Sequence, residues 1–497
     1  MPDTGAPEHR ITRRRFLVAA GAIVVGGLAA ASLDLLGTLT RVARPTPSAA
    51  PTPEPHRVYF SRPDLASPII ESTASGVAPA PGFIFLTPSN GTGHDGPTIV
   101  DDAGELVWMR PGTGKAMTDL RVSSYRGEPV LTWWEGTNNG GIGSGEHVVI
   151  DGSYRELTRI QAVNGRQADL HELQLTPAGT ALFFADTGTA PAPAAGATPG
   201  YAQVMDCEVQ EIDLATGSLL FEWHAADHIA LDESVVGAPT GANAVYDYVH
   251  ANSIDVDTDG NLIVSARNTS AIYKIDRRSG AIRWRLGGKR SDFAMGPGTA
   301  FAFQHDARRQ PDGTLTLFDD GAGPGPSRAI VLRLDETAMT ATLVREYTQP
   351  QKLFATSQGN MQVLPDGHVF VGWGSLPHFS EFGADGTLLL NATFTASQSY
   401  RDYRFPWVGR PTDTPTVSLQ NHAGQLTLYA SWNGATEVAA WDVLAGAGAA
   451  ALSKVASAPR SGFETSISLT TKEQFVAVRA LDASGNMLGT SPLASTT

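Results

Sequence analysis

Residues 247–288 read DYVHANSIDVDTDGNLIVSARNTSAIYKIDRRSGAIRWRLGG, and this stretch decides the fold class. It contains four short runs with β-strand character, which are Val249–Val256, Leu262–Arg267, Ala271–Ile275 and Ile282–Leu286. Asp259-Gly260 and Ser279-Gly280 between them are tight hairpin turns, in which glycine supplies a positive φ. Four antiparallel strands in about 40 residues predict one blade of a β-propeller.

Two polar residues near the start of this stretch point to chemistry. His250 and Asn252 alternate with Ala251 and Ser253, so they share one face of the predicted first strand. The first strand of a propeller blade lies beside the central channel. We therefore expect the side chains of His250 and Asn252 to point into that channel.

The same blade-like pattern recurs along the chain from Val58 to about Pro406. The other units are Gly82–Arg110, Val130–Ile160, Ala168–Trp223, Phe303–Tyr347 and Gly359–Phe394. Together with the opening stretch they predict an all-β, six-bladed propeller over residues 57–410.

Four of the units can be aligned on their own turns, and each then has a polar residue near the start of its first strand. These residues are His171, His250, His305 and Asn360. Residues at one structural position in successive blades converge on the channel axis. The alignment therefore predicts a shared site built around three histidines.

Residues 411–497 differ in character and predict a second domain. They contain strand-like segments, among them SLQNHAGQLTLYASWNG and QFVAVRALDASGNMLGTSPL. Trp432 and Trp441 are the expected core tryptophans. The closing segment resembles the last strands of a fibronectin type III-like β-sandwich.

Residues 1–40 have the pattern of a targeting segment. The run TRRRFL at residues 12–17 resembles a twin-arginine signal, and an apolar stretch follows it. An ordinary basic segment before an anchor helix is the alternative, and the apolar stretch could also stay as a membrane anchor, although Asp34 opposes this. Residues 41–56 predict a proline-rich linker. We expect export by the twin-arginine translocase to the cell envelope or the medium.

Charge and cysteine content exclude several classes. The formal net charge of −14 argues against nucleic acid or an anionic membrane surface as the main partner. Cys207 is the single cysteine, so the chain can form no intramolecular disulfide and no multi-cysteine metal site. The sequence also lacks a GxxxxGK(S/T) loop and a GxSxG elbow, which argues against a nucleotide-dependent transferase and a serine hydrolase.

The three aligned histidines could bind zinc, which is the first alternative to a catalytic site. They come from different blades, however, and no carboxylate is spaced to complete a familiar motif, so we expect no metal. Arg267 ends the second strand of the His250 blade and favours an anionic oxygen group over a cation. An ion pair between Arg267 and Asp255 is the other interpretation of that arginine.

Three further residues are predicted to bind substrate. Asn252 and Asn360 belong to first strands, and Arg308 is expected to frame the channel mouth. No cofactor is expected.

Four motifs resemble those of the bacterial arylsulfate sulfotransferase family, and its actinobacterial and fungal branch more than its enteric members. They are DLHEL at His171, YVHANSI followed by SARN at His250, FQHDAR at His305 and GNMQVLPDGHVFVGWG at Asn360. The resemblance covers residues 58–406. It implies a six-bladed propeller that moves a sulfuryl group from a phenolic sulfate ester to another phenol without a nucleotide donor. Enteric members carry a disulfide, which one cysteine cannot form.

The resemblance also implies a role for the main candidate residues. His305 corresponds to the transiently sulfated nucleophile, and Arg267 to the arginine that grips the sulfuryl oxygens. His250 and Asn252 match the family's H-x-N pair, with Asn252 able to donate to a sulfuryl oxygen. His171 matches an active-site histidine of an earlier blade.

The implied chemistry is physically consistent with these residue types. Sulfuryl transfer passes through a loose transition state, so the protein mainly positions groups and stabilises charge, as in phosphoryl transfer. A neutral imidazole is a competent nucleophile at about pH 7, which suits His305. His171 or His250 could protonate the leaving phenolate and then take the proton of the acceptor phenol.

Two other classes of function stay open at this point. A propeller with an added sandwich could be a non-catalytic binding protein of the cell envelope, in which the histidines contact a ligand. The chain could also be another propeller hydrolase or lyase, which would turn over without an acceptor.

Overall fold

The computed structural model describes residues 56–185, 189–191, 203–241, 243–321, 325–422 and 425–496. The chain divides into two compact units, Met1–Thr52 and Pro53–Thr497, and all described residues belong to the second. The predicted twin-arginine signal and nearly all of the predicted linker lie outside the described residues. Within the described part of the chain, no helix is long and apolar enough to span a membrane.

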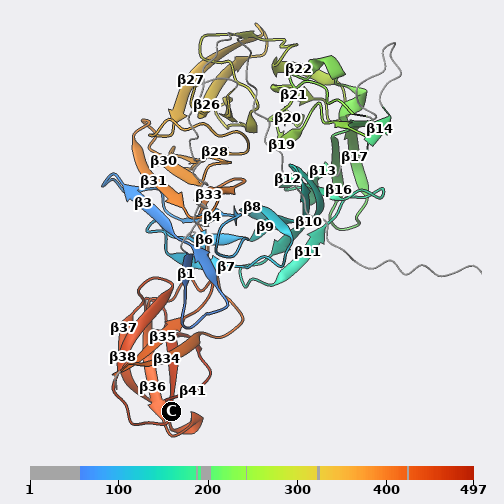
Figure 1. The fold of residues 1–497 in the computed structure, drawn as a ribbon. Coiled ribbons are helices and arrows are strands. Elements are labelled where there is room, and N and C mark those ends of the chain that lie inside the picture. Colours follow the sequence, from blue (N-terminus) through green and yellow to red (C-terminus); the bar gives the residue numbers. More distant parts are fainter. Residues whose placement is uncertain are drawn as a thin grey trace, which may run out of the picture. The chain divides into compact units, whose positions relative to one another are not determined.

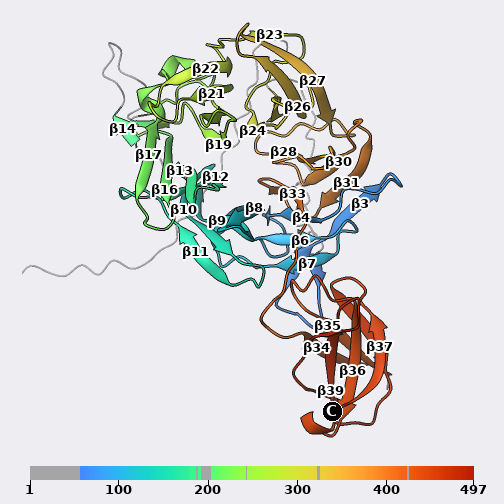
Figure 2. The same ribbon diagram turned by 180° about the vertical axis from the view of Figure 1, so that it is seen from behind.

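The described residues form β-strands almost throughout, which confirms the predicted all-β class. Helical structure within the described ranges is limited to short 3-10 turns, namely η1 (Ala225–Asp227), η2 (Leu231–Glu233) and η3 (Ala449–Ala451). Up to β33 the main sheets are arranged as a ring (Figures 1 and 2).

The first sheet of the ring joins two distant parts of the chain. Its order is β33 (Tyr403–Phe405), β4 (Phe83–Leu86), β6 (Thr98–Val100) and β7 (Leu106–Met109). The innermost strand therefore comes from the far end of the ring sequence, and Tyr403 pairs with Phe85. The ring is closed by residues that precede the predicted C-terminal domain.

The second and third sheets are connected through one Cα pair, Gly145 with Ala168. The second consists of β8 (Ala116–Tyr125), β9 (Glu128–Asn139), β10 (Ile142–Ile150) and β11 (Glu156–Ile160). The third consists of β12 (Ala168–Leu175), β13 (Thr180–Ala185), β16 (Glu208–Asp213) and β17 (Leu219–His224).

The fourth sheet is the stretch that decided the fold class. It has the order β19 (Ala251–Val256), β20 (Leu262–Ala266), β21 (Ala271–Ile275) and β22 (Ile282–Gly287). Three of the four predicted runs match closely. The first strand begins two residues later than predicted, so His250 lies just before it.

The fifth and sixth sheets complete the ring, and each gains a strand from elsewhere. The fifth contains β24 (His305–Arg309), β25 (Leu315–Asp319), β26 (Arg328–Asp335) and β27 (Thr340–Thr348), with β23 (Ala294–Met295) at its edge. The sixth contains β28 (Asn360–Val363), β29 (Val369–Gly372), β30 (His378–Phe382) and β31 (Leu388–Phe394), with β3 (Ile70–Ala74) at its edge.

Short strands make up three small sheets beside the main ones. They are β1 (His56–Val58) with β2 (Ala66–Pro68), β5 (Pro88–Ser89) with β32 (Gln398–Ser399), and β14 (Thr189–Pro191) with β15 (Gln203–Met205) and β18 (Val245–Tyr246). The β5–β32 pair again joins the two ends of the ring sequence.

Apolar side chains fill the spaces between neighbouring sheets. Trp223 and Tyr273 are buried in the cluster shared by the third and fourth sheets. Trp284 and Leu317 are buried in the cluster shared by the fourth and fifth. Burial of such large side chains is the main stabilising contribution in a fold of this kind.

Beyond Arg410 the chain forms two further sheets with a core of their own. One has the order β34 (Thr416–His422), β35 (Gln425–Ser431), β38 (Glu464–Leu469). The other contains β37 (Ser453–Pro459), β36 (Ala440–Gly446), β39 (Phe475–Leu481) and β40 (Met487–Thr490), and β41 (Ala494–Ser495) pairs with β39. Trp441 is buried in the shared core, and Trp432 packs against that core.

Candidate active site

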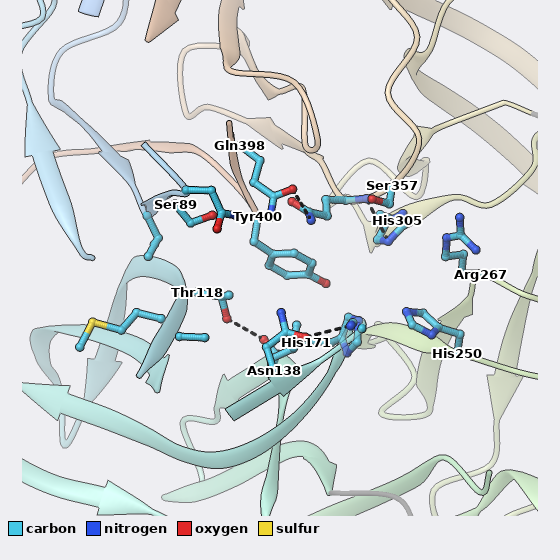
Figure 3. Close-up of a pocket in the computed structure, with 18 of the residues that line it drawn as sticks. Ser89, Thr118, Asn138, His171, His250, Arg267, His305, Ser357, Gln398 and Tyr400 are labelled. Atoms are coloured by element: carbon cyan, nitrogen blue, oxygen red, sulfur yellow. Dashed lines mark hydrogen bonds between the residues drawn. The ribbon is translucent and has the colours of Figure 1, made fainter. Parts of the chain in front are cut away.

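A cavity of about 780 Å³ lies where the inner strands begin. Residues from or next to all six main sheets contribute to its lining. Predicted residues His171, His250, His305 and Arg267 all line it (Figure 3). The structure thus brings together the three aligned histidines and the arginine that sequence reasoning had linked to the same site.

Each of these histidines is held by an aspartate at its Nδ1 atom. The Nδ1–carboxylate distances are 2.5 Å from His171 to Asp169, 2.5 Å from His250 to Asp247 and 2.7 Å from His305 to Asp320. A carboxylate on one ring nitrogen orients the imidazole and fixes its tautomer, leaving Nε2 for chemistry. Sequence reasoning missed all three aspartates.

His305 is the most enclosed of the three histidines, with 2% of its surface exposed. Its Nε2 accepts a hydrogen bond from the backbone N–H of Gln358 at 3.2 Å. Nε2 therefore carries the lone pair, and Nδ1 carries the proton that is donated to Asp320. Burial lowers the pKa of His305 well below its usual value, and the nearby charge of Arg267 acts in the same direction. His305 is accordingly a neutral base.

The backbone around His305 is held in an uncommon conformation. Phe303 and Asp306 have φ values of 54° and 56°, and the pairing of β24 with β25 shifts register between His305 and Arg308. Gln358, which donates to His305, has a φ of 71°. Positive φ in residues other than glycine carries a conformational cost and is concentrated at functional sites.

Arg267 offers a positive charge that forms no ion pair with a carboxylate among the described residues. Its Nη1 donates to Asn268 Oδ1 at 2.9 Å, and its Nη2 donates to the carbonyl oxygen of Thr356 at 3.1 Å. The guanidinium also lies over the ring of Phe303, 4.9 Å from its centroid. The alternative of an ion pair with Asp255 is not seen, because Asp255 accepts the backbone N–H of Arg309 instead.

The rings of His171 and His250 contact each other edge to face in the cavity lining. Their ring centroids are 5.0 Å apart, and the planes are nearly perpendicular. Burial alone would raise the pKa of Asp169, but the interaction with His171 outweighs burial and holds that pKa below its usual value. Asp169 is therefore an ionised carboxylate. Gly141, in the turn between β9 and β10, lies against His250: a Cβ atom there would be 3.3 Å from Cε1 of that ring.

Asn252 does not reach the cavity, contrary to the expectation that it shares a face with His250. It is fully buried, and its Nδ2 donates to the carbonyl oxygen of Gln304 at 2.8 Å. The expectation assumed a regular strand. His250 instead has a φ of 51° ahead of β19, and the pairing with β20 shifts register between Ala251 and Ser253. Alternation of side chains is lost across that step.

Asn360 and Arg308 are also outside the cavity lining. Asn360 is fully buried, and its side chain exchanges two hydrogen bonds with the backbone of Asp402, which ties β28 to the segment that closes the ring. Arg308 forms ion pairs with Glu172 and Asp306 and lines a different cavity of about 320 Å³. Asn360 was predicted from its aligned position and Arg308 from its place near the channel mouth, but both side chains make contacts between inner strands instead.

Other lining residues were not identified from the sequence. Tyr400 projects toward the histidines, with its ring centroid 5.7 Å from that of His171 (Figure 3). Asn138 lies at the end of β9, and Ser89 and Gln398 come from β5 and β32. None of these residues belongs to an aligned blade position, so periodicity carried no signal for them.

A possible metal-ligand cluster within the described ranges does not contribute to the lining of this cavity. Its members are Glu208, Glu222 and His224, on β16 and β17. The carboxylate of Glu208 is already occupied by Arg166, at 3.0 Å, and by Gln210, at 2.6 Å. The cavity histidines form no such cluster among the described residues.

The arylsulfotransferase (ASST) family model matches residues 121–395, more than half of this 497-residue chain. The matched segment contains His171, His250, Arg267 and His305. No curated protein matches the chain.

Several solved structures are similar at low identity. A protein of unknown function from Bacteroides caccae is 12% identical, with a TM-score of 0.40, over 65% of this chain and 98% of that one. Inactive virginiamycin B lyase from Staphylococcus aureus, solved with quinupristin, is 10% identical, with a TM-score of 0.35, over 73% and 97%. A Lactobacillus plantarum protein is 14% identical, with a TM-score of 0.35, over 78% and 99%.

Proposed function

The chain belongs to the arylsulfotransferase family, and on that premise we propose that it transfers a sulfuryl group from a phenolic sulfate ester to a phenolic acceptor through a sulfated His305. One observation carries the proposal. A neutral imidazole, held at Nδ1 by Asp320, lies in the same cavity as an arginine without a carboxylate partner among the described residues. That combination suits attack on an anionic sulfate ester.

The first half of the reaction would use the lone pair on Nε2 of His305. A bond forms between Nε2 and sulfur while the bond from sulfur to the phenolic oxygen breaks. Arg267 stabilises the negative charge on the sulfuryl oxygens. The N–H of Gln358, which now donates to Nε2, would then donate to a sulfuryl oxygen instead.

Proton transfer would be the task of His171 or His250. A protonated imidazole gives its proton to the leaving phenolate oxygen, and the same ring later accepts the proton of the acceptor hydroxyl. Both rings have Nδ1 on an aspartate, which stabilises the imidazolium form that exists before the first step and after the second.

Asp320 would act as a positioning residue. It is 1% exposed and touches His305 rather than substrate. Burial raises the pKa of Asp320 well above its usual value, whereas Arg267 favours the carboxylate. As Nε2 bonds to sulfur, the ring becomes more positive and its Nδ1–H donates more strongly to Asp320.

We further propose that the ring of sheets is a six-bladed β-propeller and that residues 411–497 are a fibronectin type III-like module. Twin-arginine export to the cell envelope or the medium, with or without a retained anchor, fits residues 1–40. The single cysteine supports a place with the actinobacterial and fungal members rather than the enteric ones. The sequence lacks a GxxxxGK(S/T) phosphate-binding loop, which suits a nucleotide-independent reaction.

Intact-mass analysis after mixing with 4-nitrophenyl sulfate and no acceptor tests the function. We expect a sulfuryl-sized increase on the wild-type chain and none on His305→Ala. His147→Ala is the matched control, because His147 is buried outside the cavity and should leave the adduct unchanged. An equal adduct on His305→Ala would remove His305 from the role. Steady nitrophenol release without acceptor would favour a hydrolase or lyase, and no reaction with any phenolic sulfate would favour a binding protein.

A further inference from the structure

The cavity is much larger than a phenyl sulfate requires. Its volume of about 780 Å³ lies in the upper part of the range of roughly 300–1,000 Å³ that pockets for drug-sized ligands occupy. One aromatic ring with its sulfate, placed beside Arg267 and His305, leaves a second region unfilled. That region is lined by residues of the first and second sheets and of β5 and β32, which face the fourth and fifth sheets across the ring (Figure 3).

Neutral polar groups dominate this second region. Ser89, Asn138 and Gln398 line the cavity. The amide oxygens of Asn138 and Gln398 accept from the backbone N–H of Gly141 and from Gln358 Nε2. Ser89 Oγ, Asn138 Nδ2 and Gln398 Nε2 have no hydrogen-bond partner among the described residues. Each can donate to a bound hydroxyl group, and Ser89 can also accept. Bound sugars and polyols present hydroxyl groups that both donate and accept, so these side chains suit them.

Charge in the second region does not suit another anion. Lys115 lines it, but its Nζ is already engaged by Glu135 at 3.0 Å and by Glu146 at 3.7 Å. Asp95 adds a negative charge to the same lining. The unmatched positive charge of the cavity is that of Arg267, on the other side. A neutral acceptor therefore fits this region better than an anionic one.

Apolar surface for a bare aromatic acceptor is limited. Tyr400 is a tyrosine of the lining. The guanidinium carbon of Arg401 lies over its ring, 5.0 Å from the ring centroid. His171 lies at its edge. A phenol without further groups would gain little here, whereas hydroxyl-bearing substituents would meet several free donors.

We infer that the second region is an acceptor subsite for a neutral, polyhydroxylated molecule such as a glycosylated phenol. The inference rests on the proposed function and specifies its acceptor. The acceptor oxygen would attack sulfur, the bond from sulfur to Nε2 of His305 would break, and the electron pair would return to Nε2. The acceptor proton would pass to Nε2 of His171, which Asp169 orients.

The test compares acceptors after loading with 4-nitrophenyl sulfate. Phenol, 4-hydroxyphenyl glucoside and methyl glucoside are supplied in turn, and sulfated products are measured by mass spectrometry. We expect a KM for 4-hydroxyphenyl glucoside at least tenfold below that for phenol. Equal KM values for the two phenols would overturn the inference.

Two variants and one matched control locate the subsite. Asn138→Asp removes the Nδ2 donor but keeps an oxygen for the backbone N–H of Gly141, and it should raise the KM for the glucoside at least fivefold. Ser89→Ala, which breaks no hydrogen bond to a described residue, should raise it about threefold. Asn139→Asp makes the same change on the next residue of β9, which is outside the lining, and should behave as wild type. Equal losses with phenol and with the glucoside would contradict a subsite for the sugar.

The donor half-reaction separates this inference from the proposed function. A wild-type chain that forms the sulfated adduct without acceptor, yet shows no preference for the glucoside, overturns the inference alone. A chain that forms no adduct overturns the proposed function and the inference with it.

Discussion

The ring holds arginines in two contrasting settings. Arg267 lines the cavity without a carboxylate partner among the described residues, whereas Arg121, Arg308 and Arg401 share the buried Glu172. We call these three arginines with Glu172 the buried ion cluster. Burial alone would raise the pKa of Glu172, but the charges of Arg308 and the other two arginines outweigh burial and lower it to about 2. An arginine that is paired with a carboxylate thus stabilises the fold, whereas an arginine without such a pair can bind an anionic ligand.

The largest effect should come from removing the centre of the buried ion cluster. Glu172→Gln leaves three buried guanidinium groups with one carboxylate fewer, which should cost about 3–5 kcal/mol of unfolding free energy. Chemical denaturation followed by tryptophan fluorescence measures it. Glu156→Gln, which breaks a partly exposed pair with Arg159, is the control and should cost under about 1 kcal/mol. Similar losses for both variants would contradict the comparison.

Arg267→Ala should show the opposite pattern, with stability kept and chemistry lost. No ion pair to a described residue is broken, but one donor to the sulfuryl oxygens disappears, which should cost about 3 kcal/mol of transition-state stabilisation. Donor half-reaction rates and a thermal melt, measured on the same sample, check both expectations. Arg290→Ala removes an exposed arginine paired with Asp232 and should leave the rate unchanged.

Asp402 offers a third case for the comparison. It is a buried acid that has no cation partner among the described residues. Burial raises its pKa to about 8, and Ser399 offsets this only in part. Because the folded-state pKa is above the unfolded value, the stability from this group is full below about pH 4 and is lost as pH rises toward 8.

Asp402→Asn removes that titration. The unfolding free energy of the variant relative to wild type should rise by about 2 kcal/mol between pH 6 and pH 8. Urea denaturation at a series of pH values measures the difference. Asp213→Asn, at an exposed turn, is the control and should show no such trend over this interval. A pH-independent difference for Asp402→Asn would show that its carboxyl group is already ionised in the folded chain.

The smallest effect concerns how His305 is positioned. Asp320→Asn keeps the shape of the pair but weakens the hold on the Nδ1–H tautomer. We expect a donor half-reaction about tenfold slower, with an unchanged KM for 4-nitrophenyl sulfate and a final yield of one nitrophenol per chain. A higher KM, or a reduced yield, would show that Asp320 binds substrate or supports folding instead.

The sequence was a good guide to the sheets and to the residues that start inner strands. Runs such as Leu262–Arg267 and their glycine turns are local signals, and the structure places β20 at Leu262–Ala266. His171 and His305 followed from alignment of repeated units. Periodicity failed where the backbone left the regular strand, as at His250, whose positive φ separates its direction from that of Asn252.

The remaining site residues depend on contacts between distant segments. Asp320 meets His305 only because β25 returns beside β24, and Gln358 reaches the same imidazole from the turn before β28. Nothing in the spacing of either residue distinguishes it from an ordinary loop position. Unmatched charge is likewise a property of the packed state, so Arg267 and Arg308 could not be told apart before their partners were seen.

Closure of the ring by β33 and β4 has a consequence for the order of events during synthesis. Tyr403 pairs with Phe85, and Ser399 pairs with Pro88, so one wall of the cavity cannot form until those late residues have left the ribosome. Contacts between such distant segments are slow to form in a growing chain. A nascent chain that already displays His305 and Arg267 would still lack Tyr400 and Gln398. The complete cavity can thus form only after nearly all of the ring has been translated.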